Sequence, residues 1–147
     1  MSSVIYNSYV RDVITGSIDM DTDSFKMMLV GSTYDAIADE TKKDSHSKRS
    51  DITNEITGVG YTAGGNAATA SVGSIDTTNN RVEVTFTISN WTSATISNTY
   101  GGVIYKSRGG ASSADELVAY VAFSNSPVSC TNGTLSVSFT SNLRFQN

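Results

Sequence analysis

The chain has 147 residues, a net charge of -4 and only 16% charged residues, while serine and threonine supply more than a quarter of it. This length fits one domain, residues 1–147, which can bury a core without disulfides or a structural metal, and the composition favours strands and turns over long helices. Four of the ten basic residues lie between Lys42 and Arg49, and no segment resembles a membrane helix or a signal peptide. We therefore expect a protein made in the cytoplasm that binds neither nucleic acid nor a membrane directly.

Apolar residues recur at helical spacing near the N-terminus. They predict an amphipathic helix over residues 4–14, with Ser2 or Ser3 as N-cap and Gly16 as the C-terminal stop. The next apolar run, residues 25–30, is apolar at both alternating sets of positions, which is typical of a strand buried on two sides. It is the predicted central strand.

The polar segment from Asp35 to Ile52 has no sustained period and predicts a long exposed loop, with room for a helical turn near residues 36–40. Glycines and small residues between 57 and 70 predict extended, bulged backbone. Strict alternation over 82–88 predicts a strand with one core face, and Trp91 is expected in the turn after it. Further strands are predicted over residues 95–97, 102–106, 117–123 and 135–140.

Short turns between strands, with one helix at the start, favour antiparallel pairing. We predict a mainly β fold, an antiparallel β-sandwich or closed sheet of about six to eight strands with one short N-terminal helix.

Residue types that perform catalysis or bind metals are scarce. The only histidine, His46, lies in a polar run and is expected to be solvated, and Cys130 is expected to be a small buried hydrophobe. Asp19, Asp21 and Asp23 have the opening spacing of a calcium loop, but Ser24 and Val30 stand where that loop needs glycine and glutamate, so Asx turns are the better explanation. Glycine pairs beginning at residues 64, 101 and 109 lack the context of a phosphate loop. No catalytic, metal-binding or cofactor-binding residue is predicted, and an enzyme is the least favoured class.

Two longer stretches resemble a family of structural proteins from tailed bacteriophages. One is Asp19–Leu29, and the other runs from Arg49 to Gly65 and contains Asn54-Glu55-Ile-Thr-Gly58-Val-Gly60-Tyr61-Thr-Ala-Gly64-Gly65. The resemblance continues through residues 82–84, 90–91, 102–106 and 109–120, whereas residues 40–49 and 142–147 depart from the pattern. It implies a virion protein similar to head decoration or cement subunits, although relatives are also labelled as tail or fibre proteins.

The leading hypothesis is thus a non-enzymatic capsid decoration protein on the surface of the virion, which binds the major capsid protein and is a homo-oligomer, with a trimer preferred. The predicted N-terminal helix and the 35–52 loop are the expected contact surfaces. The candidate interface residues are Tyr6, Tyr9, Val10, Val13, Trp91 and Tyr100.

Two alternatives stay open at this stage. One is a tail, neck or fibre-associated component that contacts tail proteins. The other is a carbohydrate-binding β-sandwich for host attachment, in which Trp91, Tyr100 and Tyr105 would stack on sugar rings.

Overall fold

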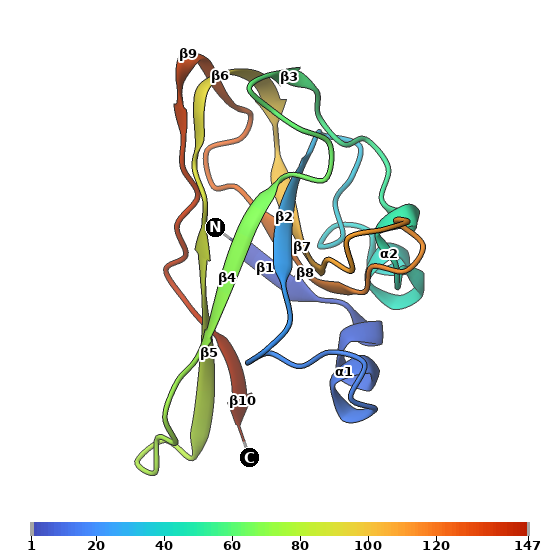
Figure 1. The fold of residues 1–147 in the computed structure, drawn as a ribbon, viewed down its shortest axis with the longest axis vertical. Helices are drawn as coiled ribbons and strands as arrows, with labels where there is room; N and C mark the ends of the chain where they lie inside the picture. The colour runs from blue at the N-terminus through green and yellow to red at the C-terminus, as the bar shows by residue number, and fades with distance from the viewer. Residues whose placement is uncertain (1, 147) are drawn as a thin grey trace.

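The computed structural model describes residues 2–146. This part of the chain contains ten strands, two short α-helices and one 3-10 helix, joined by loops (Figure 1). The elements in chain order are β1 (Ser2–Ile5), α1 (Asn7–Ile14), β2 (Phe25–Val30), α2 (Glu40–Ser45), the 3-10 helix η1 (Arg49–Asp51), β3 (Gly58–Val59), β4 (Asn66–Val72), β5 (Arg81–Ile88), β6 (Trp91–Thr99), β7 (Gly101–Lys106), β8 (Leu117–Ala122), β9 (Val128–Leu135) and β10 (Leu143–Gln146).

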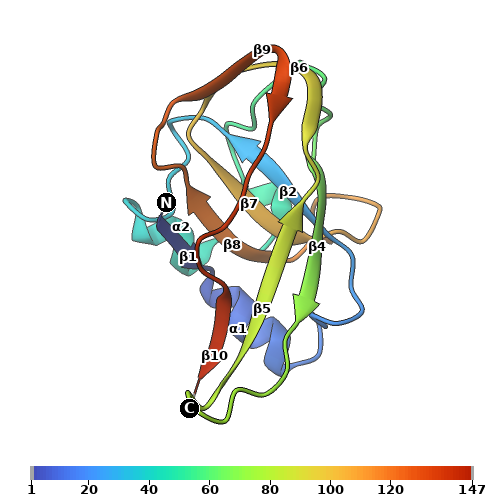
Figure 2. The ribbon, with the colours of Figure 1, turned by 90° about the vertical axis from the view of Figure 1, so that its left-hand side faces the viewer.

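Seven strands form one curled sheet in the order β1-β8-β7-β2-β4-β5-β10, and every neighbouring pair is antiparallel (Figures 1 and 2). β2 is the fourth strand of the seven, and five of its six residues are buried. The predicted central strand over 25–30 is confirmed, because apolar side chains at both alternating sets of positions can be buried only where both faces of the sheet are covered.

A second, three-stranded sheet has the order β3-β6-β9 and lies at the upper end of the molecule in Figure 1. The pairing of β6 with β9 contains several register shifts, consistent with bulged strands. Both sheets contribute to one hydrophobic core, in which Trp91 and Ile96 of β6 join the side chains of β2, β7 and β8. The predicted mainly β, antiparallel class is confirmed, with more strands than the six to eight expected.

Trp91 does not lie in a turn as predicted: it is the first residue of β6, is 1% exposed and stacks on Tyr61 with ring centroids 6.2 Å apart. Burial of so large an apolar surface outweighs the turn preference of the Ser89-Asn90 pair before it.

The predicted helix over 4–14 is wrong at its start. Residues 2–5 form β1, which pairs with β8, and the helix begins at Asn7. Neither Ser2 nor Ser3 caps it, and the capping position is Tyr6, whose side chain makes no capping bond. The C-terminal stop is confirmed, because Gly16 has a φ of 74° and donates its N–H to the Val13 carbonyl.

The strand predicted over 135–140 is also displaced. β9 ends at Leu135, and residues 136–142 run on without strand pairing to β10. Val137 is nevertheless buried and Phe139 half-buried, so the alternating pattern identified a buried face correctly, although residues 136–140 are not a strand.

Candidate functional site

The six candidate interface residues divide into core and surface residues. Tyr6, Tyr9 and Trp91 are at most 1% exposed within the single chain, so they belong to the core and supply no contact surface. Val10 is 47% exposed, while Val13 and Tyr100 are partly exposed. The helical spacing was read correctly, but Tyr9 marks the buried face of α1 and Val10 the outer one.

The aromatic platform proposed for sugar binding is not assembled. Tyr105 is 1% exposed, and its hydroxyl donates to the Gly64 carbonyl at 2.7 Å. Trp91 is equally buried, so among the three residues only Tyr100 is partly exposed. Stacking on a sugar needs an exposed ring face, which two of the three residues lack.

The glycine-rich stretch over residues 54–65 folds around one carboxylate. Glu55 Oε1 accepts the Tyr61 hydroxyl at 2.7 Å and the Gly64 N–H, and the Tyr61 oxygen in turn accepts the Leu29 N–H at 3.0 Å. Gly65 has a φ of 74°, and a Cβ there would collide with the backbone of Met27. The stretch is thus a structural clasp across β2, and its glycines allow the close backbone approach.

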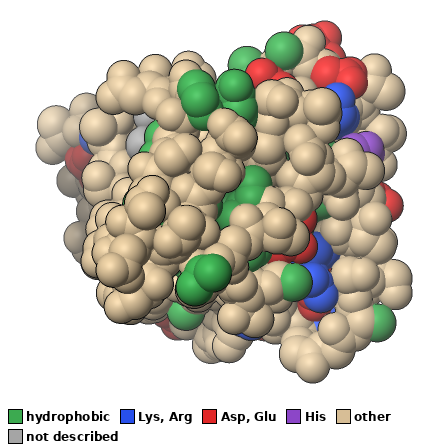
Figure 3. Space-filling model, turned by 90° about the horizontal axis from the view of Figure 1, so that it is seen from above, with side chains coloured by type: hydrophobic (Ala, Val, Ile, Leu, Met, Phe, Trp, Pro, Cys, Tyr) green, Lys and Arg blue, Asp and Glu red, His purple; other side chains and the backbone are tan. Residues whose placement is uncertain are grey.

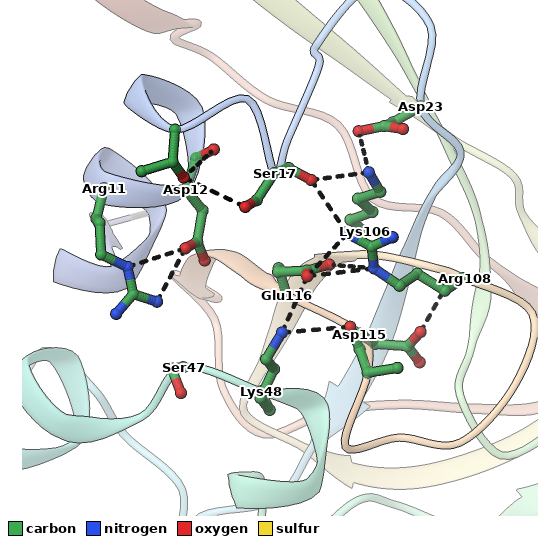
Figure 4. Close-up of polar contacts among 12 residues, drawn as sticks. Arg11, Asp12, Ser17, Asp23, Ser47, Lys48, Lys106, Arg108, Asp115 and Glu116 are labelled. Carbon is green, nitrogen blue, oxygen red and sulfur yellow. Dashed lines mark hydrogen bonds and ion pairs between the residues drawn. The ribbon is translucent and has the colours of Figure 1, made fainter.

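Four cations and three carboxylates form what we call the charge cluster, drawn in part in Figure 4. Its members are Asp23, Lys48, Arg49, Lys106, Arg108, Asp115 and Glu116. Asp115 and Glu116 are at most 5% exposed. Sequence reasoning missed both, although an acidic pair immediately before an apolar strand, with a basic pair at 48–49, was the available signal.

Each buried carboxylate of the charge cluster has a cationic partner. Arg49 Nε lies 2.8 Å from Asp115, while Glu116 accepts from Lys48 Nζ and Arg108 Nε, each at 2.9 Å. Lys106 Nζ lies 2.7 Å from Asp23. Carboxylates that are paired in this way stabilise the contact between chain segments, and the arrangement leaves neither buried carboxylate free to act as a base.

Burial raises the pKa of Glu116, but the hydrogen bonds from Arg108 and Lys48 outweigh burial, so the pKa lies below its usual range. The charged form is therefore the form that the fold stabilises.

The charge cluster anchors the segment predicted to be an exposed loop. Backbone bonds join Arg49 N–H to the Asp115 carbonyl at 2.9 Å and Leu117 N–H to the Ser47 carbonyl at 3.1 Å. The predicted helical turn near 36–40 is present, because the Asp39 N–H donates to the Asp35 carbonyl at 3.2 Å, and α2 and η1 follow it in the same segment. The loop prediction for Asp35–Ile52 is wrong because ion pairs and backbone bonds, not apolar periodicity, hold the segment.

His46 is not simply solvated. Its Nδ1 lies 3.0 Å from the Tyr34 hydroxyl, which lies 2.8 Å from the Tyr6 hydroxyl. Burial raises the pKa of Tyr34 to about 12 and raises that of Tyr6 further, so both phenols stay neutral. This chain of three polar groups connects α1, the Tyr34 turn and the end of α2.

Of the three aspartates, only Asp19 forms the predicted Asx-type turn. Asp19 Oδ1 accepts the Asp21 N–H at 2.9 Å, and Asp23 Oδ2 accepts the Asp19 N–H at 2.7 Å. Within residues 2–146, no group of three or more acidic, histidine or cysteine side chains is arranged to hold a metal ion.

Cys130 is half-buried on β9 and not fully buried as expected. No helix in the described part of the chain is both long and apolar enough to cross a membrane.

Exposed apolar side chains are concentrated around the N-terminal segment. Four of the eight large ones among the described residues belong to β1, α1 and β10, and we call these four the N-terminal apolar set: Ile5, Val10, Ile14 and Phe145. Contact of the Tyr9 and Phe145 rings, with centroids 6.3 Å apart, places α1 against β10. The opposite end, seen in Figure 3, is dominated by neutral polar side chains and backbone, with charged groups along the α2 side.

Comparison with known proteins finds no matching family model, no matching curated protein and no matching solved structure.

Proposed function

We propose that this chain is a non-enzymatic structural protein of a bacteriophage particle, and specifically a decoration subunit that binds the outer shell formed by the major capsid protein. The sequence resemblance supports this role, because its longest stretch coincides with the Glu55 clasp. A pattern of that length with a defined structural purpose at each of its key positions is more informative than an isolated glycine pair.

The observation that carries the proposal is the N-terminal apolar set. Val10 and Ile14 lie one turn apart on the outer face of α1, and Ile14 is 80% exposed. Beside them the curled sheet ends in two edge strands, β1 and β10, each paired on one side only. Exposed apolar groups beside open edges suit a contact with another protein.

Each such contact is small, and decoration of a lattice is a setting in which small contacts suffice. A subunit that bridges neighbouring shell subunits binds the assembled shell in preference to separate subunits and therefore stabilises it by mass action. Several weak sites on one oligomer add through multivalency, which favours a homo-oligomer such as a trimer.

The segment 35–52 contributes less to this contact than the sequence predicts. Lys48 and Arg49 are paired with Glu116 and Asp115, and Lys42 is paired with Asp39. Its cations are therefore already engaged within the chain. α1 becomes the principal contact element.

Binding to particles that lack the protein tests the proposal. Purified chain is mixed with such particles, which are then sedimented, and the retained protein and the temperature of shell opening are measured. We expect saturable retention and a higher opening temperature for the wild type. Ile14→Asp should reduce retention at least tenfold, because it places a charge in the apolar contact, whereas Val59→Asp on β3 serves as the matched control at the other end of the molecule.

Failure of the wild-type chain to bind, or equal retention of the two variants, would contradict the proposal. Binding at the tail instead of the head, seen by electron microscopy of labelled protein, would replace the decoration role with the tail role.

A further inference from the structure

The curled seven-stranded sheet has two open edges, β1 and β10. Six successive antiparallel pairings separate β1 from β10, so these two edge strands run in the same direction. They cannot pair with each other in the antiparallel manner of the rest of the sheet. One further strand, antiparallel to both, restores the alternation.

We propose that the gap between β1 and β10 is a binding slot for a single extended segment of a different polypeptide, which enters as the eighth strand. The proposal does not depend on the particle role, because it follows from the topology, the unpaired backbone groups and the cavity described next.

The outward-facing backbone groups of β1 follow from its pairing with β8. Tyr6 donates its N–H to the Val118 carbonyl at 3.1 Å, and the register continues through Val4 opposite Tyr120. In an antiparallel pair, alternate residues direct their N–H and C=O groups toward the partner. Tyr6 and Val4 therefore face β8, and the N–H and C=O groups of Ser3 and Ile5 face the gap.

The pairing of β10 with β5 likewise shows which backbone groups of β10 face the gap. Gly73 donates to the Glu83 carbonyl at 2.8 Å on the β4 side, so Val82 and Val84 direct their backbone groups toward β10. Leu143 lies opposite Val84. The backbone groups of Arg144, the next residue, consequently face the gap from the other side.

A cavity of about 130 Å³ lies between these two edges. Apolar side chains from the inner face of the sheet line much of it, including Val84, Phe86, Ile104 and Val121. An engineered cavity of about 150 Å³ holds a benzene molecule, so this volume accommodates one aliphatic side chain of about the size of leucine. The expected occupant is thus a short extended segment with one aliphatic side chain directed inward and small polar residues beside it.

No described segment of this chain already occupies the slot. Residues 136–142 pass beside it, and Phe139 and Thr140 line the cavity, but residues 136–142 make no backbone–backbone hydrogen bond within the described part of the chain. A second copy is a poor occupant, because its strands are already joined to their own sheets, whereas the slot requires a strand with both edges free. An extended arm of another protein meets that requirement.

A synthetic peptide, acetyl-Lys-Thr-Ser-Leu-Ser-Thr-Lys-amide, tests the slot because strand addition depends mainly on backbone bonds. Titration into the isotope-labelled chain should shift the amide resonances of Ser3, Ile5 and Arg144 saturably, with a dissociation constant of about 1 mM or tighter. Replacing the peptide's leucine with aspartate should weaken binding at least tenfold. No saturable shift up to about 10 mM, or shifts elsewhere only, would overturn the proposal.

Two variants separate backbone pairing from general surface binding. Ser3→Pro removes an N–H that faces the gap, while Ser3→Ala keeps that N–H; the residue is exposed and does not donate to β8. We expect Ser3→Pro alone to weaken peptide binding at least fivefold, with both variants retaining the wild-type spectrum for β2 and β7. Equal binding by the two variants would contradict strand addition.

The direction of the bound peptide is a second readout. A spin label at its N-terminus should broaden the Ile5 amide more than the Ser2 amide, since an antiparallel strand begins where β1 ends. The reverse order would contradict the slot. A dimer that forms without peptide and protects the Ser3 and Ile5 amides would identify a second copy as the occupant and would also refute it. These measurements use the isolated chain, so they can fail while particle binding succeeds, and the converse also holds.

Discussion

Gly65 and Gly109 share one backbone conformation and differ in what surrounds them. Their φ values are 74° and 75°. At Gly65 an added Cβ would meet the backbone of Met27, while at Gly109 nothing lies within 4 Å. The pair therefore separates the cost of the left-handed conformation from the cost of lost space.

Gly109→Ala should lower the free energy of unfolding by about 1–2 kcal/mol, which is the cost of placing a Cβ in the left-handed region. Gly65→Ala should lower it by at least about 3 kcal/mol more, or prevent folding, because β2 and the clasp must separate. Urea denaturation of both variants measures the difference. Equal losses would show that Gly65 is needed only for its conformation.

Glu116 gives stability a specific dependence on pH. Its pKa in the folded protein lies below the ordinary value of 4.5, so the stability it contributes is present above about pH 4.5 and is lost as the pH falls through the lower, folded-state value. Glu116→Gln should cost about 3 kcal/mol at pH 7, because Lys48 and Arg108 lose a buried anionic partner.

That cost should shrink steadily as the pH is lowered below 4.5, where the wild-type carboxylate becomes protonated. Chemical denaturation at a series of pH values measures the difference between the two proteins. Glu40→Gln is the control, because Glu40 is exposed and its substitution removes only a contact of 3.7 Å with Lys43. This variant should change the free energy of unfolding by less than about 0.5 kcal/mol. A constant Glu116→Gln cost down to pH 3 would contradict the assigned role.

At the scale of elements, patterns of burial were predictable and pairing was not. β2, β5, β7 and β8 follow from runs or alternation of apolar residues, and all were predicted within one or two residues. β1 was taken for helix because Ile5 of β1 and Tyr9 of α1 are apolar residues of two different elements that happen to have helical spacing. β10 was missed because it is a polar edge strand with one neighbour.

The functional surface was only partly predictable. The sequence indicated α1 and Val10, but it could not distinguish Trp91 as a core residue, since a lone tryptophan after a strand fits either environment. The acidic pair before β8 and the basic pair at 48–49 are visible in the sequence, but their contact joins residues more than 60 positions apart, so no local pattern predicts it.

Amide hydrogen exchange tests the corrected view of the 35–52 segment. The Arg49 amide donates to Asp115, and the Leu117 amide donates to Ser47. Both should exchange at least about 100-fold more slowly than those of Gly109 and Gly110, which lie in an exposed turn. Comparable rates would mean that the segment is the exposed loop predicted from the sequence.

At the scale of the whole molecule, two features point outward: the N-terminal apolar set and the open edges of the curled sheet. The core, the Glu55 clasp and the charge cluster form a fixed framework behind them. This division is compatible with the proposed role, in which the chain binds and braces other subunits.

The number of copies of this chain per purified phage particle, measured by quantitative mass spectrometry against the major capsid protein, tests the central claim most directly. Decoration of the shell predicts a ratio near one to one or another fixed large fraction. A ratio of one copy to several tens of capsid subunits would indicate a tail or neck protein instead. Absence of the chain from particles would contradict the structural role altogether.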